Sequence, residues 1–439
     1  MVHFNQSRMN DSWIKQIISN FFANGTDVFG KESTYHGFEA IDPNPDSALT
    51  TPDGFQSVQL YGKILYKDEK NSCVKSIPII IKSTPGSACS KFISFSFANE
   101  INFYSKMVPI MSTIDDSFSS LFPTFYHAEM MFSEKQSESA IVFENLKSRG
   151  FKLAEKKSFL DYQHLALMMR KLGQFHAYSY KAKSDNFVSR LFNPIAKSFQ
   201  ETSPIMNGEM QISIDVLQST ANRGLELLKK DAKYSPYISQ IHSLVQNVDI
   251  IYKRALTADK ENPILVLTHG DYLRNNVMFR YENDTPDDML MIDMATCRYG
   301  SPVIDLVSVL YINADQATRN KYWDELIDEY YTALKKTFPD NQVPSKNAIL
   351  SEFVGKSFYG YIVAAYFLPS LIADDYKIPY PPEMDPEICR KFDEFNFEEV
   401  PREMWMKLFL LVGGDLGTQA LKDILQDMID RGFICSQLK

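Results

Sequence analysis

Four residues in the second half of the chain have the types and spacing that phosphoryl transfer needs. His269, Asp271 and Asn276 lie within LTHGDYLRNNVMF, and Asp293 follows in YENDTPDDMLMIDM. Phosphoryl transfer requires a carboxylate that accepts the acceptor's proton, and oxygen ligands that hold Mg²⁺ against the phosphates. Asp271 could supply the first, and Asn276 with Asp293 the second. Taken alone, a His-x-Asp-x4-Asn string also arises by chance, as polar residues in turns.

The residues after Asn276 predict a hairpin that closes this group. VMFRY and MLMIDM have the composition of two short strands, and Asn-Asp-Thr-Pro-Asp-Asp between them has that of a turn. Such a hairpin would bring Asp293 back beside Asp271 and Asn276.

A candidate ion pair, Lys82 with Glu100, lies earlier in the chain. SVQLYGKILYK and VKSIPIIIK predict two strands of a hairpin ending in Lys82, and KFISFSFANEINFYSKM has the helical spacing that places Glu100 on a helix. In a kinase-like site the ammonium binds the α- and β-phosphates and the carboxylate holds it in place. A Lys at a strand end is more often a solvated charge, but its position ahead of the Asp271 motif favours the functional interpretation.

The remaining segments predict a connection followed by helices. SAIVFENLKSRGF indicates a strand that enters a hinge between two lobes, where backbone groups near Glu144 and Leu146 could pair with an adenine edge. His176 shares an apolar helical face with Leu165 and Leu172, which favours a core histidine over a catalytic base. The apolar stretch 357–373 is short for a membrane span and Pro369 interrupts it, so it predicts a buried helix.

Composition limits the class of protein. The chain has 439 residues, of which 44% are hydrophobic and 23% charged, as is typical of globular proteins. A net charge of −9 argues against nucleic acid or an anionic membrane as the main partner. The five cysteines show no CxxC spacing and the N-terminus has no signal-peptide pattern, so a cytoplasmic location is expected. The pattern of residues 13–21 predicts a helix instead, and the oligomeric state is not indicated.

The sequence resembles the ecdysteroid kinase-like family, also called CHK kinase-like. The resemblance lies in HGDYLRNNVMF, MIDMATCRYGSPVIDLVSVL, FANEINFY, IVFENLKSRGF and LGQFHAYS, in that family's order and spacing. This family is similar to choline kinases and aminoglycoside phosphotransferases and shares the protein-kinase fold. The resemblance therefore implies an α+β, two-lobed fold: a small N-terminal lobe at 1–146 with an antiparallel sheet and one helix, and a large, mainly helical C-terminal lobe at 147–439.

The resemblance also implies a role for each candidate residue. Asp271 corresponds to the catalytic aspartate, Asn276 and Asp293 to the Mg²⁺ ligands, and Lys82 and Glu100 to the phosphate-binding pair. His269 and Asp305 correspond to residues that support the catalytic loop. Two segments depart from the family: Asp293-Met294-Ala295 stands where Asp-Phe-Gln is usual, and TTPDGFQSV contributes a single glycine, Gly54, to the turn over the phosphates, where Ser57 could donate instead.

The function predicted on these grounds is an ATP- and Mg²⁺-dependent kinase that phosphorylates a hydroxyl of a small molecule. By analogy with the family the acceptor is an ecdysteroid or a similar apolar alcohol, and aromatic residues of KSFYGYIVAAYF could line its pocket. The two departures motivate an alternative, a catalytically inactive kinase-like protein that binds a small molecule or nucleotide. A protein kinase is disfavoured, because the chain has His-Gly-Asp and lacks Asp-Phe-Gly and Ala-Pro-Glu.

Overall fold

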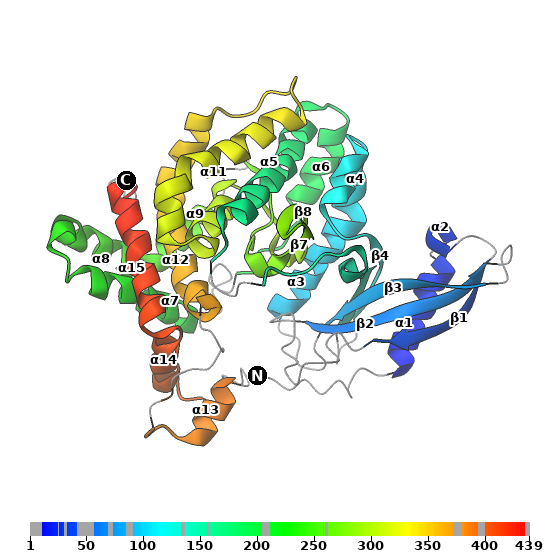
Figure 1. Ribbon diagram of the computed structural model, residues 1–439, viewed down its shortest axis with the longest axis horizontal. Helices are drawn as coiled ribbons and strands as arrows, with labels where there is room; N and C mark the ends of the chain where they lie inside the picture. The colour runs from blue at the N-terminus through cyan, green and yellow to red at the C-terminus, as the bar shows by residue number, and fades with distance from the viewer. Residues whose placement is uncertain are drawn as a thin grey trace.

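The structure is a computed structural model that describes residues 11–24, 26–29, 33–41, 57–68, 73–84, 91–132, 137–155, 159–203, 211–257, 259, 262–372, 380, 382–393 and 400–434. Figure 1 shows a small N-terminal part built on a sheet and a larger part built mainly of helices. This confirms the predicted α+β, two-lobed, protein-kinase-like fold. The boundary at residue 146 stays a prediction.

The small lobe contains a five-stranded antiparallel sheet in the order β1-β2-β3-β5-β4. Its strands are β1 (Ser33–Ala40), β2 (Val58–Asp68), β3 (Val74–Ser83), β4 (Phe125–Phe132) and β5 (Ser137–Glu144). The β2–β3 ladder runs from the Val58–Ser83 pair to the Lys67–Val74 pair, which confirms the predicted hairpin. Lys82 is the second-last residue of β3 and pairs with Gln59 of β2.

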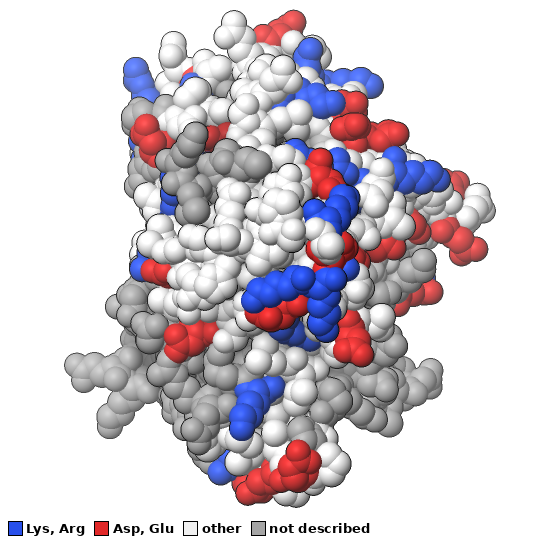
Figure 2. Space-filling view, turned by 90° about the vertical axis from the view of Figure 1, so that its left-hand side faces the viewer, with Lys and Arg blue, Asp and Glu red and all other residues white. Residues whose placement is uncertain are grey.

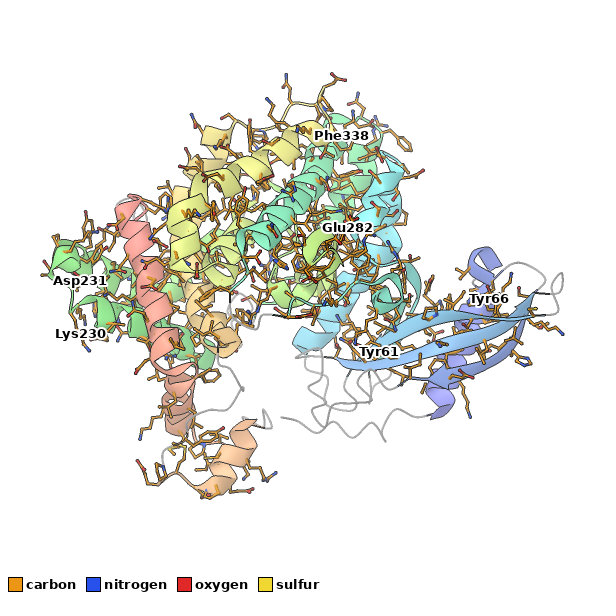
Figure 3. All side chains as sticks on the ribbon, viewed as in Figure 1. Tyr61, Tyr66, Lys230, Asp231, Glu282 and Phe338 are labelled. Atoms are coloured by element: carbon orange, nitrogen blue, oxygen red, sulfur yellow. The ribbon has the colours of Figure 1, made fainter. Side chains whose placement is uncertain are left out.

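The two faces of this sheet pack against different elements because successive side chains in a strand point to opposite sides. Ile79 and Ile81 of β3 join one buried cluster with Ile17 and Phe21 of the N-terminal helix α1 (Asp11–Asn24), which short α2 (Thr26–Phe29) extends. Lys82 has the opposite parity and faces away from α1. Two residues of β2 that Figure 3 labels also lie on opposite faces of the sheet. Tyr66 belongs to the cluster with α1, whereas the ring of Tyr61 lies on the other face, beneath the Lys147 ammonium.

The helix on the Lys82 side of the sheet is α3 (Lys91–Asn102). It continues without a break into a π-turn (Phe103–Met107) and α4 (Val108–Ser112), followed by a 3₁₀ turn (Asp116–Leu121). Phe97, Phe103 and Tyr104 enter the main core together with Phe143 of β5. The predicted helix around Glu100 is therefore confirmed, and it connects the sheet to the core of the large lobe.

The large lobe is built mainly of helices. They are α5 (Tyr162–Ser184), α6 (Val188–Ala196), α7 (Gln211–Leu228), α8 (Ile238–Gln246), α9 (Val248–Leu256), α10 (Val303–Val307), α11 (Gln316–Thr337), α12 (Lys346–Ile372), α13 (Pro386–Asp393), α14 (Arg402–Leu411) and α15 (Gly414–Asp430). Most of these helices pack around one extended core, and α13 and α14 share a separate small cluster. Leu165, Leu172 and His176 of α5 are all fully buried, as predicted. At Gly173 a Cβ atom would lie 2.3 Å from the backbone oxygen of Tyr330, so α5 and α11 pack backbone to backbone.

Residues 357–372 of the apolar stretch lie in α12 and are largely buried, which confirms the predicted core helix. Pro369 does not end the helix, because α12 continues to Ile372. Within the described residues, no helix combines the length and apolar character needed to cross a membrane. On the face shown in Figure 2 basic and acidic side chains are intermixed, so neither sign dominates that surface.

Two small two-stranded sheets hold the candidate site. β6 (Val266–Thr268) pairs with β9 (Arg298–Gly300), and β7 (Val277–Glu282) pairs with β8 (Thr285–Met291). The predicted six-residue turn between β7 and β8 is wrong, because the strands are joined by Asn283 and Asp284 alone. Both residues have positive φ, 49° and 61°, as the tight turns that match strand twist require.

Candidate active site

The candidate catalytic loop, residues 269–276, begins where β6 ends and is held by Asp305 of α10. The Asp305 carboxylate accepts hydrogen bonds from the backbone N–H groups of His269 and Gly270, both at 2.8 Å. Gly270 has φ +85°, and a Cβ atom there would lie 2.2 Å from the backbone oxygen of Thr296. Only glycine therefore fits this position, and the predicted structural support from Asp305 corresponds to a direct contact.

His269 links the loop to the end of β8. Its Nε2 lies 3.0 Å from the backbone oxygen of Ile292, so this nitrogen must carry a proton and donate. Burial lowers the pKa of His269, which favours the neutral ring. Nδ1 is then an acceptor and receives the backbone N–H of Asp271 at 3.4 Å. The ring therefore connects the end of β8 with the catalytic loop, and both of its nitrogens are used within the protein.

Asp271 and Asn276 are in direct contact. Asn276 Nδ2 donates to Oδ2 of Asp271 at 2.8 Å and to its backbone oxygen at 2.9 Å. The turn between them is fixed from outside by Asn313, which accepts from the backbone N–H of Arg274 at 2.9 Å and donates to the backbone oxygen of Tyr272 at 3.3 Å. Burial and the Asp293 charge raise the pKa of Asp271 to about 7.

Asp293 is brought to this pair by the β7–β8 hairpin. The backbone N–H of Ile292 donates to the backbone oxygen of Asn276 at 3.0 Å, which sets the end of β8 beside the loop. Asp293 then leaves the strand in the left-handed conformation, with φ 62° and ψ 67°. Its side chain keeps 39% of its area exposed and lies 3.0 Å from Lys82 Nζ. Burial acts against ionisation, but Lys82 lowers the pKa of Asp293 below its usual value.

Lys82 joins the two lobes through carboxylates. Its Nζ lies 2.7 Å from Glu100 Oε2 and 3.0 Å from Asp293 Oδ1. Although burial opposes its charge, these two carboxylates raise the pKa of Lys82, so it remains an ammonium ion. Glu100 is 1% exposed, and burial raises its pKa against the opposing effect of Lys82. One cation thus connects strand β3, helix α3 and the end of β8.

The donor set of Asn276 and Asp293 fits a magnesium ion bound through a nucleotide. Mg²⁺ in such sites takes one or two protein oxygens and the phosphates, instead of a complete protein cage. No cluster of three or more His, Cys, Asp or Glu suited to a metal occurs among the residues that the structure covers. The amide nitrogen of Asn276 is directed to Asp271, so its Oδ1, which accepts from Asn275 Nδ2 at 3.3 Å, would be the atom that faces a metal. The ionised, partly exposed Asp293 carboxylate would supply the second ligand.

The predicted nucleotide-side residues lie at the junction of the lobes. Glu144 ends β5, its backbone N–H donates to Thr124 at 2.9 Å, and its carboxylate accepts from Thr124 and Arg149. Leu146 is buried with Phe151, Met278 and Leu290. Ser57 directly precedes β2, whose first residue pairs with Ser83 beside Lys82. Gly54 and the other residues of the segment TTPDGFQSV up to Gln56 lie outside the described residues.

The sequence did not reveal the supports of Asp305. His176 is fully buried, its Nε2 lies 3.1 Å from Asp305 Oδ2, and its Nδ1 lies 2.9 Å from the Tyr330 hydroxyl. Because a carboxylate only accepts, Nε2 donates to Asp305, and in the neutral ring Nδ1 accepts a hydrogen bond from the tyrosine hydroxyl. His176 is thus a core histidine, as expected, but one that orients the carboxylate holding the catalytic loop. Its apolar spacing carried no signal of this contact.

Replacing Tyr330 by phenylalanine should lower the free energy of unfolding by about 1–3 kcal/mol. The change leaves His176 Nδ1 buried without a donor, and an unsatisfied buried polar atom has a cost of that order. Urea unfolding of the full chain measures it, with Tyr331→Phe on the same helix as the matched control. Equal stability of the two variants would contradict the proposed importance of this hydrogen bond.

The raised pKa of Asp271 predicts how stability depends on pH. The folded pKa of Asp271 is about 7, above the ordinary value of 3.8, so the folded state holds this proton more tightly than the unfolded state. The contribution of Asp271 to the free energy of unfolding is therefore greatest below pH 4 and is lost as the pH rises to 7 and above. Asp271→Asn should therefore gain stability relative to wild type on going from pH 4 to pH 8. Urea unfolding without Mg²⁺ at both pH values tests this, with the exposed turn variant Asp284→Asn as control. A gain that is the same at both pH values would contradict it.

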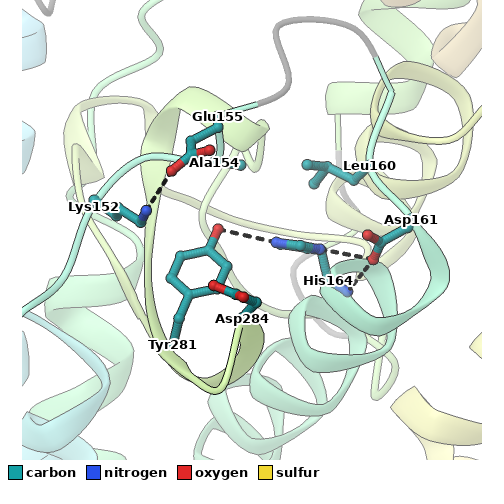
Figure 4. A pocket seen from close by; sticks show the side chains of 8 residues that line it. All are labelled: Lys152, Ala154, Glu155, Leu160, Asp161, His164, Tyr281 and Asp284. Carbon is teal, nitrogen blue, oxygen red and sulfur yellow. Dashed lines mark hydrogen bonds and ion pairs between the residues drawn. The ribbon is translucent and has the colours of Figure 1, made fainter.

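A surface pocket of about 300 Å³, shown in Figure 4, lies away from this site. Its lining includes Tyr281 and Asp284, which lie at the turn end of the β7–β8 hairpin, with His164 between Asp161 and the Tyr281 hydroxyl. Asn276 and Asp293 flank the open end of the same hairpin. Five or six residues of strand, roughly 20 Å, separate the two places. The pocket is therefore not part of the candidate active site.

Comparison with known proteins gives one family and several solved structures. A model of the ecdysteroid kinase-like family matches residues 52–342. A search among curated proteins finds no match. A mutant of aminoglycoside 2'-phosphotransferase-IIIa in complex with GDP is 11% identical, with a TM-score of 0.43, over 96% of this chain and 99% of that chain. The microcompartment-associated aminopropanol kinase is 11% identical, with a TM-score of 0.35, over 97% and 99%.

Proposed function

The chain belongs to the ecdysteroid kinase-like family of phosphotransferases, and on that premise we propose that it transfers the terminal phosphoryl group of ATP to a hydroxyl group of a small molecule. The observation that carries the proposal is the convergence of five side chains from both lobes on one place. Lys82 forms ion pairs with Glu100 and Asp293, and Asn276 forms a hydrogen bond with Asp271. Each group has the chemistry that its role requires.

Asp271 is the proposed catalytic base. A general base works best when its pKa lies near the working pH, and burial with the Asp293 charge brings that of Asp271 to about 7. The hydrogen bond from Asn276 Nδ2 holds Oδ2 of the carboxylate and would leave Oδ1 to accept the proton of the acceptor hydroxyl. Asp305 and His269 fix the backbone on which this geometry depends.

Lys82, Asn276 and Asp293 are the proposed phosphate side of the site. Lys82 would contact the α- and β-phosphates, with Glu100 holding the ammonium in position. Asn276 and Asp293 would hold Mg²⁺, which, when bound, compensates the negative charge of the phosphates. At the hinge, the backbone of Glu144 and Leu146 is assigned to the adenine edge, and Ser57 to the phosphates.

Met294 and Ala295, which differ from the residues usual in the family, still pack firmly after the proposed metal ligand Asp293. Met294 is fully buried in the main core, and the backbone oxygen of Ala295 accepts from Asn99 of α3 at 3.2 Å. Thus the residues after Asp293 remain anchored to both the core and the helix that carries Glu100. This favours retained turnover over the inactive binding protein.

Product formation separates the two candidates. The full chain is incubated with ATP, Mg²⁺ and a mixed panel of steroid and small alcohols, and mass spectrometry is used to search for a product heavier by one phosphoryl group. The kinase proposal expects such a product with at least one alcohol and none with Asp271→Asn at equal times. Nucleotide binding without any product across the panel would instead favour the binding protein. An ecdysteroid or similar apolar alcohol is the proposed acceptor class.

A further inference from the structure

The candidate catalytic loop carries a buried arginine that the proposed mechanism does not use. Arg274 lies between the proposed base, Asp271, and the proposed metal ligand Asn276, and it is 7% exposed. A cation at this place in a phosphotransferase suggests a contact with phosphate, but the guanidinium is directed elsewhere. Its Nη2 donates to the backbone oxygen of Leu371, close to the C-terminal end of α12. The side chain therefore links the loop to a helix residue 97 positions further along the chain.

This contact is favourable for both partners. The last four carbonyl groups of an α-helix have no partner within the helix, and Leu371 is the second-last residue of α12. A positive group is stabilising there, because the helix dipole is negative at its C-terminal end. A hydrogen bond with an ionised donor is also stronger than a neutral one. Leu368, Leu371 and Ile372 all belong to the main core, so the end of α12 that receives the bond is itself held in place.

The backbone of Arg274 is fixed by a second element. Its N–H donates to Oδ1 of Asn313 at 2.9 Å, and Asn313 ends the π-turn that follows α10. Two residues further on, Asn276 Nδ2 donates to Oδ2 of Asp271 at 2.8 Å. A shift of Arg274 would therefore move the hydrogen bond that orients the proposed base.

Helix α12 also supports the start of the loop. A Cβ atom at Gly360 of α12 would lie 2.6 Å from Cβ of Val307, so α12 packs closely on α10. The carboxylate of Asp305 on α10 binds the first two backbone N–H groups of the loop. Leu371 lies eleven residues beyond Gly360, about 16 Å along the helix at 1.5 Å per residue. One helix thus supports both halves of the catalytic loop, through Asp305 at its start and through Arg274 near its end.

We propose that Arg274 is a positioning residue for phosphoryl transfer, which keeps Asp271 in place by fastening the catalytic loop to the end of α12. This inference rests on the proposed kinase function and adds to it a residue that touches neither the nucleotide nor the acceptor. Transfer rates depend steeply on placement, since a misplacement of about 1 Å can lower a rate by about 10²-fold. Arg274 therefore acts on kcat through Asp271 and contributes little to nucleotide binding.

Steady-state kinetics and binding measurements on the full chain test the catalytic part of this role. Arg274→Ala should lower kcat by about 10–100-fold, while the KM for ATP and the Kd of ADP with Mg²⁺ stay within about threefold of wild type. Arg274→Lys keeps a charged donor without the planar fork and should recover part of the loss. Methylguanidinium at millimolar concentration should raise the kcat of Arg274→Ala and leave that of wild type unchanged.

Hydrogen–deuterium exchange tests the structural part without any turnover. Peptides that cover residues 269–276 should exchange roughly tenfold faster in Arg274→Ala than in wild type, because a charge-assisted hydrogen bond that opposes opening is lost. Arg431→Ala is the matched control. Arg431 also donates from Nη2 to a backbone oxygen, that of Arg319 at 3.1 Å, but at the C-terminal end of α15. Its loss should lower stability and leave both kcat and loop exchange as in wild type.

The outcomes separate failure of this inference from failure of the proposed function. Equal loop exchange in Arg274→Ala and Arg431→Ala overturns the inference, as does an unchanged kcat in Arg274→Ala or an equal fall of kcat in both variants. Faster loop exchange confined to Arg274→Ala, with a lower kcat that methylguanidinium raises, supports it. If Arg274→Ala does not fold, Arg274→Lys against Arg431→Lys carries the same comparisons with smaller effects. If wild type forms no phosphorylated product, the kinase function fails, and loop exchange alone decides whether Arg274 fixes the loop.

Discussion

Replacing Asp271 by asparagine should lower kcat by about 10²–10⁴-fold, the usual contribution of a general base, and leave the fold intact. Asparagine has nearly the same shape, and the hydrogen bond from Asn276 to the backbone oxygen of residue 271 does not depend on the carboxylate. Only the group that accepts the acceptor's proton is lost. The affinity for Mg²⁺ and ADP should therefore stay close to that of wild type.

Single-turnover assays with a reactive alcohol give the rate of this variant, and thermal unfolding followed by circular dichroism verifies its fold. Asp284→Asn, in the exposed turn of the β7–β8 hairpin, is the matched control and should turn over like wild type. A turnover of Asp271→Asn within about threefold of wild type would remove Asp271 from the role of base.

Replacing Asp293 by alanine should abolish Mg²⁺-dependent phosphoryl transfer. This carboxylate is the proposed metal ligand and also lies 3.0 Å from Lys82, so its loss removes one ligand and frees the lysine from one of its two partners. Because position 293 has a positive φ, alanine adds backbone strain, whereas asparagine adopts this conformation more readily. Asp293→Asn is therefore the companion variant, with the same loss of activity and a smaller loss of stability.

Titration of Mg²⁺ at fixed ATP measures the effect. Both variants should remain at background rate at all Mg²⁺ concentrations, while Asp287→Ala, which removes an exposed carboxylate from the same hairpin, should follow the wild-type curve. Recovery of the wild-type rate at high Mg²⁺ in Asp293→Ala would show that the metal is bound mainly by other residues.

The sequence predicted those parts of the site that depend on local patterns. The parity of β3 places Lys82 on the face opposite Ile79 and Ile81, and helical spacing places Glu100 on α3. The hairpin that returns Asp293 was also predicted, although its turn was assigned four residues too many. Pro286 pairs with Tyr281 at an irregularity in the ladder, where a strand tolerates proline.

The contacts that the sequence did not predict join distant segments. His176, Asp305 and Tyr330 form one hydrogen-bonded line from three helices, and each of them separately has an ordinary core or helix-start pattern. Arg298 and Glu201 meet across almost a hundred residues. Such pairs depend on how helices pack, which the spacing within any one element does not encode.

The left-handed backbone of Asp293 helps to distinguish a working enzyme from a protein that has lost catalysis. At φ 62° and ψ 67°, glycine is free of strain, whereas most other side chains cost about 1 kcal/mol or more, and aspartate and asparagine somewhat less. A chain that no longer needed the carboxylate could gain stability by a single substitution there. An aspartate kept at a position where the backbone favours glycine is thus more readily explained in a working enzyme than in a protein drifting away from catalysis.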